Sequence, residues 1–100
     1  MTKQEFLQKL SETKNNFKWE INSSYELRGW KDGQTFCPIT AVILIENGVY
    51  VPSNFADKAR IYLNMDMRDI ESIMQTADGM QFGCNKRLRN EMKAALGLEN

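Results

Sequence analysis

The sequence of 100 residues predicts an α+β fold that is mainly helical, with about five short helices and one small β-hairpin near the N-terminal third. Three observations support this prediction. Apolar residues recur three and four positions apart in most segments, which is the spacing of an amphipathic helix. One segment alternates apolar and polar residues instead, as a half-buried strand does. Polar capping residues and glycines stand at the boundaries between the segments, where they favour helix ends and turns.

Composition and length are those of one globular domain spanning residues 1–100. Hydrophobic residues make up 42% of the chain and charged residues 26%, well away from the profile of a disordered protein. Thirteen basic residues balance thirteen acidic ones, so binding of nucleic acid or an anionic membrane would need a local patch. The longest apolar run, residues 41–45, is far shorter than the roughly 20 residues of a membrane span. We therefore expect a cytoplasmic protein that does not enter membranes.

The first elements are a short helix and a hairpin. Thr2 and Glu5 have the spacing of a capping box, which predicts that a helix over residues 3–15 begins here. Its apolar stripe is Phe6, Leu7 and Leu10. Residues 17–22 and 25–30 then alternate in polarity on either side of a Ser-Ser pair, which predicts a two-stranded antiparallel hairpin. The next four residues, KDGQ, have turn chemistry.

Residues 38–52 admit two interpretations. Their Val, Ile and Tyr residues favour strands, and Asn47-Gly48 between apolar runs is a strong hairpin signal. Pro38, however, suits the first turn of a helix and would remove a hydrogen bond from a central strand. The apolar run after it shows no alternation, as in a helix buried all round, and Asn47-Gly48 can end such a helix with a left-handed cap. We favour the helix, followed by an extended segment, and keep the hairpin as the alternative.

Three further helices are predicted in the second half of the chain. Ser53 or Asn54 can cap the first, Asp66 the second and Asn85 the third. Gly97-Leu98 has the pattern that ends a helix in a Schellman motif. The three apolar stripes are Phe55, Ala59, Tyr62 and Leu63; Ile70, Ile73, Met74 and Ala77; and Leu88, Met92, Ala95 and Leu96. The side chains expected in the core are Ile43, Leu44, Ile70, Ile73, Leu88 and Leu96.

The chain contains no histidine, and this excludes several common chemistries. Ser-His-Asp and Cys-His catalysis and the usual histidine-containing zinc sites all require one. We expect no catalytic residue, metal or cofactor. Cys37 is the candidate thiol, because free NH groups at a helix start favour a thiolate. A thiol enzyme or redox sensor would also need a base beside it. We therefore interpret Cys37 as a packed core residue and keep thiol chemistry as a second alternative. Cys84 is the cysteine expected at the surface.

Two short predicted helices joined near Asn64 suggest a degenerate helix-turn-helix. Asparagine replaces the glycine that is usual in that turn. Residues 66–78, which would form the recognition helix, carry four acidic residues and Arg68, a net charge of −3. Such a helix would repel phosphates. Nucleic-acid binding therefore stays the first alternative, either through this pair or through the basic last helix.

The start of the last helix is the one electrostatic anomaly of the sequence. Lys86, Arg87 and Arg89 follow the cap residue Asn85, although the helix macrodipole disfavours cations in a first turn. We expect these four residues to contact an anionic or acidic partner. The leading hypothesis is a non-enzymatic protein-protein interaction or adaptor module, with self-association as one form of that interaction.

Overall fold

The computed structural model describes residues 1–52, 56–80 and 83–98. These residues form five α-helices, one 3-10 turn and a three-stranded antiparallel sheet. The elements in chain order are α1 (Lys3–Glu12), η1 (Thr13–Asn15), β1 (Lys18–Ile21), β2 (Leu27–Lys31), β3 (Gln34–Phe36), α2 (Pro38–Asn47), α3 (Ala56–Leu63), α4 (Met67–Ala77) and α5 (Lys86–Ala95). The predicted fold class, mainly α with a small hairpin near the N-terminal third, is confirmed.

α1 begins at the predicted capping box. The Glu5 amide donates to Thr2 Oγ1 at 3.1 Å, and the Thr2 amide donates to Glu5 Oε1 at 3.0 Å. Phe6 and Leu10 are fully buried, and Leu7 is half-buried. The predicted helix over residues 3–15 is present, with its last turn tightened into η1.

The predicted hairpin is formed by β1 and β2, but its second strand begins at Leu27 rather than at Tyr25. The Asn22 side chain is the reason, because its Oδ1 accepts from the amides of Ser24 and Glu26 at 2.9 Å each. An asparagine that bonds the backbone two residues on forms a turn. Tyr25 accordingly lies in the turn, at φ 64°, instead of in the strand.

β3 is a third strand that the sequence did not reveal. It pairs with β2 so that Trp30 lies opposite Thr35. Asp32 and Gly33 connect the two strands with φ of 52° and 79°, the left-handed conformations that a tight two-residue hairpin requires. The KDGQ turn was therefore predicted correctly, and three strand residues after it are too few to show alternation.

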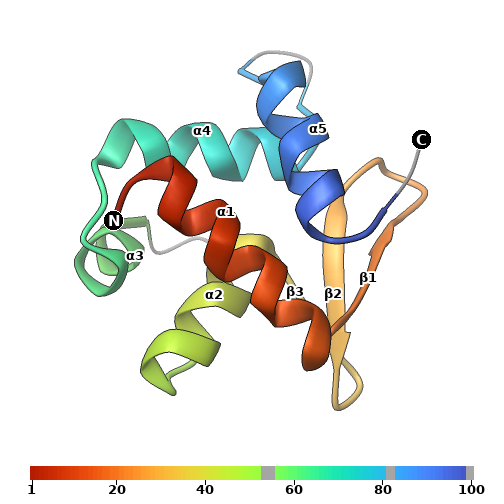
Figure 1. Cartoon of the computed structure of the whole chain (residues 1–100), viewed down its shortest axis with the longest axis horizontal. Helices are drawn as coiled ribbons and strands as arrows, with labels where there is room; N and C mark the ends of the chain where they lie inside the picture. The colour runs from red at the N-terminus through yellow and green to blue at the C-terminus, as the bar shows by residue number, and fades with distance from the viewer. Residues whose placement is uncertain (53–55, 81–82, 99–100) are drawn as a thin grey trace.

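Of the two interpretations of residues 38–52, the helix is correct, because Pro38–Asn47 form α2. Cys37 is its N-cap, Pro38 its first residue, and Gly48 closes it in the left-handed conformation at φ 70°. The expectation of burial all round is wrong for its second half. Residues 38–43 are buried, but Leu44 is only half-buried and Ile45 is 38% exposed. The end of α2 extends beyond the elements that cover its start (Figure 1).

α2 is also the centre of the packing. It contacts α1, α3 and α4 as well as β2 and β3. Figure 1 shows α1 crossing the front of the molecule, with α4 and α5 above it, α2 and α3 to its lower left and the sheet to its right. An apolar helix with neighbours on several sides needs no polar stripe where it is covered, which explains the absence of periodicity in its sequence.

The helices of the second half follow their predicted stripes with one exception. Asp66 caps α4 through its bond from the Arg68 amide at 2.8 Å. α5 ends in the predicted Schellman pattern, in which the Leu98 amide donates to the Lys93 carbonyl. Tyr62 belongs to the predicted apolar stripe but is 43% exposed, because Ala59 and Leu63 form the buried line of α3. The proposed cap residues Ser53 and Asn54 and the stripe residue Phe55 lie outside the described residues.

Five of the six expected core residues are buried. Ile43, Ile70 and Ile73 have no exposed surface, and Leu88 and Leu96 retain only 4% each. Leu44 is the exception, for the reason given above. The stripes of α4 and α5 therefore fix which faces of these two helices remain outside.

Candidate functional site

The start of α5 is held in place by its cap residue and by α4. Asn85 Oδ1 accepts from the Leu88 amide at 3.0 Å, as predicted. The Asn85 amide donates to Thr76 Oγ1 at 3.2 Å, which joins the cap to the last turn of α4. Leu88 and Met92 are buried on the inner side. The first turn of α5 is thus oriented from two directions.

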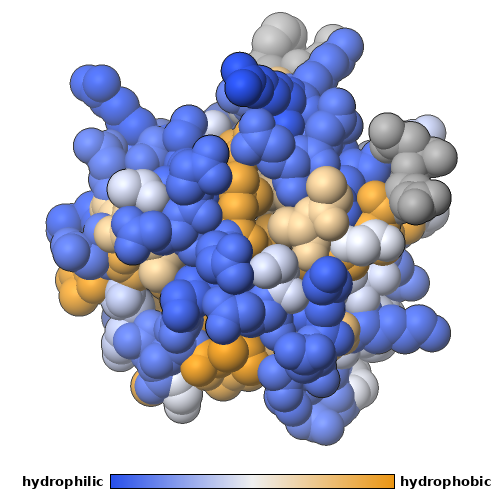
Figure 2. Space-filling view, in the orientation of Figure 1, coloured by the Kyte–Doolittle hydropathy of each residue, from blue (hydrophilic) through white to orange (hydrophobic). Residues whose placement is uncertain are grey.

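A groove of about 390 Å³ lies between the start of α5 and the start of α1. Leu7 of α1 and Leu88 of α5 supply its apolar surface. Figure 2 shows a hydrophobic strip between these two helices, bounded on both sides by hydrophilic side chains. The full lining is Thr2, Lys3, Gln4, Leu7, Asn85, Arg87, Leu88 and Glu91. Two of the four predicted contact residues, Asn85 and Arg87, therefore line one concave surface.

The other wall of the groove was missed by sequence reasoning. Thr2, Lys3 and Gln4 come from the opposite end of the chain. The capping box predicted that a helix starts here, but nothing in its pattern indicates which other helix start it will face. Only the packing of α1 against α5 brings the two together.

The charges beside the groove are exposed and only loosely paired. Arg87 Nε lies 3.3 Å from Glu91 Oε1, and the Arg87 side chain is 91% exposed. Lys3 Nζ lies 4.0 Å from Asp69 Oδ1. Lys86 is exposed but is not part of the groove lining. Exposed pairs of this kind contribute about 0 to 1 kcal/mol. The cations are therefore available to a carboxylate or phosphate at little energetic cost.

The first turns of α1 and α5 differ in whether they contain an acidic residue near the free NH groups of the helix start. α1 has Glu5 in its first turn, and the Thr2 backbone amide, followed by the Thr2 side chain, lowers the pKa of this carboxyl below its ordinary value. α5 has no acidic residue in its first turn. A carboxylate near a helix N-terminus is favourable, and α5 does not supply its own.

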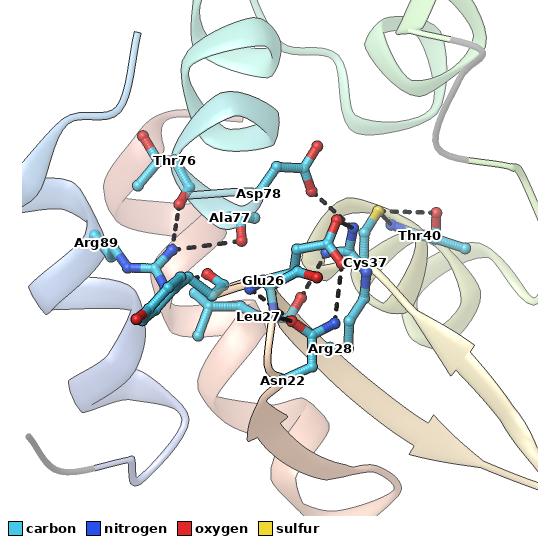
Figure 3. A network of polar contacts seen from close by, with 12 residues as sticks. Asn22, Glu26, Leu27, Arg28, Cys37, Thr40, Thr76, Ala77, Asp78 and Arg89 are labelled. Atoms are coloured by element: carbon cyan, nitrogen blue, oxygen red, sulfur yellow. Dashed lines mark hydrogen bonds and ion pairs between the residues drawn. The ribbon is translucent and has the colours of Figure 1, made fainter. Parts of the chain in front are cut away.

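Arg89, the fourth predicted contact residue, points away from the groove. Its Nη1 donates to the carbonyl oxygens of Thr76 at 2.7 Å and Ala77 at 3.4 Å, and its Nη2 donates to the carbonyl of Tyr25 (Figure 3). These contacts join α5 to the end of α4 and to the hairpin turn. Contrary to the expectation from the sequence, the fold therefore gives a reason for a cation at position 89.

A second set of polar contacts joins the hairpin to α4 nearby. Arg28 Nη2 lies 2.8 Å from Asp78 Oδ1 and 3.0 Å from Glu26 Oε2. The Asn22 side chain donates to the other Glu26 oxygen at 2.9 Å. Figure 3 shows this network beside the Arg89 contacts. Each member has a partner within the chain, so the network serves to hold the sheet against α4.

Cys37 lies in the core and bonds to its own helix. It is 9% exposed, and its sulfur lies 3.4 Å from the Thr40 amide that donates to it and 3.2 Å from Thr40 Oγ1. The Thr40 hydroxyl in turn donates to the Val51 carbonyl at 2.9 Å. A sulfur with these contacts caps α2. Cys84 is half-buried, ahead of Asn85.

The helix pair α3 and α4 retains the charge that disfavours DNA binding. Asn64 adopts φ 49° in the turn between them, a conformation that asparagine tolerates, so the missing glycine is no obstacle to the turn. Asp66, Glu71 and Arg68 are all exposed on α4 or at its cap. Within the described ranges, no helix has the length and apolar character needed to cross a membrane.

Comparisons with known proteins add no relative. The sequence matches no protein family and no curated protein, and the structure matches no solved structure. The groove and its charges are therefore the basis for a functional proposal.

Proposed function

We propose that this protein is a non-enzymatic protein-binding module, and that the groove between α1 and α5 receives an acidic segment of its partner. One observation carries the proposal. Arg87 lines a groove with a leucine surface, and its chain neighbour Lys86 is also exposed, at a helix start that disfavours cations. Residues that keep an unfavourable local choice are expected at functional sites.

The groove suits a short segment with mixed chemistry. Its volume lies in the range of typical ligand clefts. An apolar side chain of the partner would cover Leu7 and Leu88, while a carboxylate of the partner would approach Arg87. Charged groups at the edge of such a contact mainly provide specificity and a faster encounter. The apolar contact provides most of the affinity.

A cytoplasmic location belongs to the same proposal. Both cysteines are free thiols, as is usual in a reducing compartment. The partner is then another protein of that compartment or a second copy of this chain. Self-association is one outcome of the experiment below, which includes a measurement of mass.

The first test is an NMR titration with a defined probe. The probe is a ten-residue peptide of alternating glutamate and leucine, with a lysine-leucine peptide of the same length as control. We expect the amide signals of Gln4, Leu7, Lys86 and Arg87 to shift with the acidic peptide only. Shifts that map to the sheet, or equal shifts with both peptides, would refute the proposed site. Sedimentation without peptide measures self-association.

The second test uses a charge variant with a matched control. Lys86→Ala combined with Arg87→Ala removes the two exposed cations in the first turn of α5, of which Arg87 lines the groove. Lys14→Ala combined with Lys18→Ala removes two exposed cations elsewhere. We expect the first pair to weaken peptide binding about three- to tenfold, in line with the loss of two exposed ion pairs, and the second to leave it unchanged.

A nucleic acid is the competing ligand for the same cations. A 20-nucleotide single-stranded nucleic acid should bind the wild-type protein weakly. The Lys86→Ala, Arg87→Ala variant should bind it with the same affinity. Tight binding that falls steeply with salt and disappears in that variant would favour the nucleic-acid alternative over a protein partner.

A further inference from the structure

A second groove, of about 230 Å³, lies on the outer face of α4 and is separate from the one between α1 and α5. The two grooves have no lining residue in common. The lining of the second is Ala56, Glu71, Met74, Gln75, Asp78 and Met80. Four of these six residues come from α4 and its C-cap, so one face of α4 forms the length of the groove.

Methionine provides the apolar surface of this groove. Met74 is half-buried and packs against the core, whereas Met80 is 48% exposed. Methionine is unbranched and polarisable, and exposed methionines suit contact surfaces that adapt to different apolar side chains. An exposed apolar side chain beside a half-buried one offers such a surface at the protein exterior.

Two carboxylates border the methionines. Glu71 and Asp78 are seven residues apart, which places them two helical turns and about 10 Å apart along the same face of α4. Arg28 holds one oxygen of Asp78 at 2.8 Å and also contacts Glu26. Arg28 therefore contacts two carboxylates, and the two charged residues that line the groove, Glu71 and Asp78, are both acidic.

We propose that this α4 groove binds a basic amphipathic helix of a partner protein. Charge complementarity selects the occupant, because Glu71 and Asp78 favour lysine or arginine side chains at a similar spacing. Two cations seven residues apart on a partner helix meet that requirement, and the apolar residues between them contact Met74 and Met80. A helix that lays its apolar face into a hydrophobic groove is a common mode of peptide recognition.

The occupant is opposite in charge to the acidic segment proposed for the groove between α1 and α5. The two surfaces can therefore be tested independently with probes of opposite sign. Loss of one interaction leaves the other in place.

The test is methyl NMR on protein with ¹³C-labelled methionine methyl groups. The probe is a 14-residue amphipathic helix composed only of leucine and lysine, and the control has glutamate in place of each lysine. We expect the Met74 and Met80 methyl signals to shift with the lysine peptide, while the buried Met65 and Met92 signals stay in place.

Two variants and one matched control locate the contact. Glu71→Lys reverses a charge at the groove and should weaken peptide binding about three- to tenfold. Met80→Gln keeps the size of an exposed side chain but removes its apolar character, and should also weaken binding. Glu12→Lys makes the same charge change on α1, at an exposed position, and should leave binding unchanged.

Three results would overturn the proposal. These are equal methyl shifts with the glutamate peptide, equal weakening by Glu71→Lys and Glu12→Lys, or binding that leaves the Met80 signal unmoved. Because Met80 and Glu71 are exposed, their variants should fold normally, and a thermal melt of each confirms this before the titration.

Discussion

The basic residues at the start of α5 fall into two groups that differ in direction. Arg89 faces inward and donates to carbonyl oxygens of α4 and of the hairpin turn. Lys86 and Arg87 are exposed, and Arg87 lines the groove. The three residues look alike in the sequence, yet Arg89 joins α5 to other elements of the fold, whereas Arg87 pairs with Glu91 on α5 itself.

The difference lies in which helix end each side chain serves. The last carbonyl groups of a helix lack intrahelical partners and favour a nearby cation. Arg89 is therefore unfavourably placed with respect to α5 but well placed at the end of α4, where its planar fork reaches Thr76 and Ala77. A cation that seems misplaced on its own helix can be correct for the neighbouring one.

The largest expected loss of stability comes from removing a core side chain of α4, and the effects at the basic residues of α5 can be compared with it. Ile73 has no exposed surface, and Ile73→Ala should lower the free energy of unfolding by about 2 to 5 kcal/mol. Chemical denaturation measures this loss. A loss below about 0.5 kcal/mol, the usual range of surface substitutions, would mean that the α4 stripe does not face the core.

Arg89→Ala separates the inward residue from the outward pair. It should destabilise the fold by about 1.5 to 3 kcal/mol, the range for hydrogen bonds to charged groups, because the carbonyls of Thr76 and Tyr25 lose a donor. The matched control is the Lys86→Ala, Arg87→Ala variant, which should stay within about 0.5 kcal/mol of wild type. Equal losses in the two variants would remove the distinction between the groups.

The two thiols test the same contrast between an inner and an outer position. Cys37 is buried and Cys84, which precedes the α5 cap, is only half-buried. Iodoacetamide at neutral pH should alkylate Cys37 more slowly than Cys84, by roughly tenfold or more, because Cys37 must wait for a local opening. Mass spectrometry of timed samples gives both rates. Faster alkylation of Cys37 would revive the thiol alternative.

The smallest expected effect is on the pH dependence of stability, through Glu5 in the capping box of α1. The Thr2 amide lowers the pKa of Glu5 below its ordinary value of 4.5. This contribution to stability is present above that value and is lost as the pH falls through the lower folded pKa. The Tm of wild type should therefore fall slightly more between pH 6 and pH 3 than that of Glu5→Gln. Parallel Tm curves would show that the carboxylate adds nothing.

Local patterns predicted most of the fold because their causes are local. The Thr2 and Glu5 capping box, the Asn85 cap and the Gly48 helix end all involve residues within a few positions of each other. The errors arose where distant neighbours decide. Leu44 and Tyr62 have helical spacing, but their exposure depends on how far other elements cover α2 and α3.

The sequence by itself determined the helices, the first hairpin and the presence of cations at the start of α5, since capping, periodicity and turn chemistry act over a few residues. Tertiary structure alone decided that α1 forms the second wall of the groove, that Arg89 serves α4, and that Lys86 and Arg87 stay outside. The physical reason is that periodicity shows which face of a helix is buried but not what packs against it. Which end of which helix a side chain meets is set by packing between segments far apart in the chain.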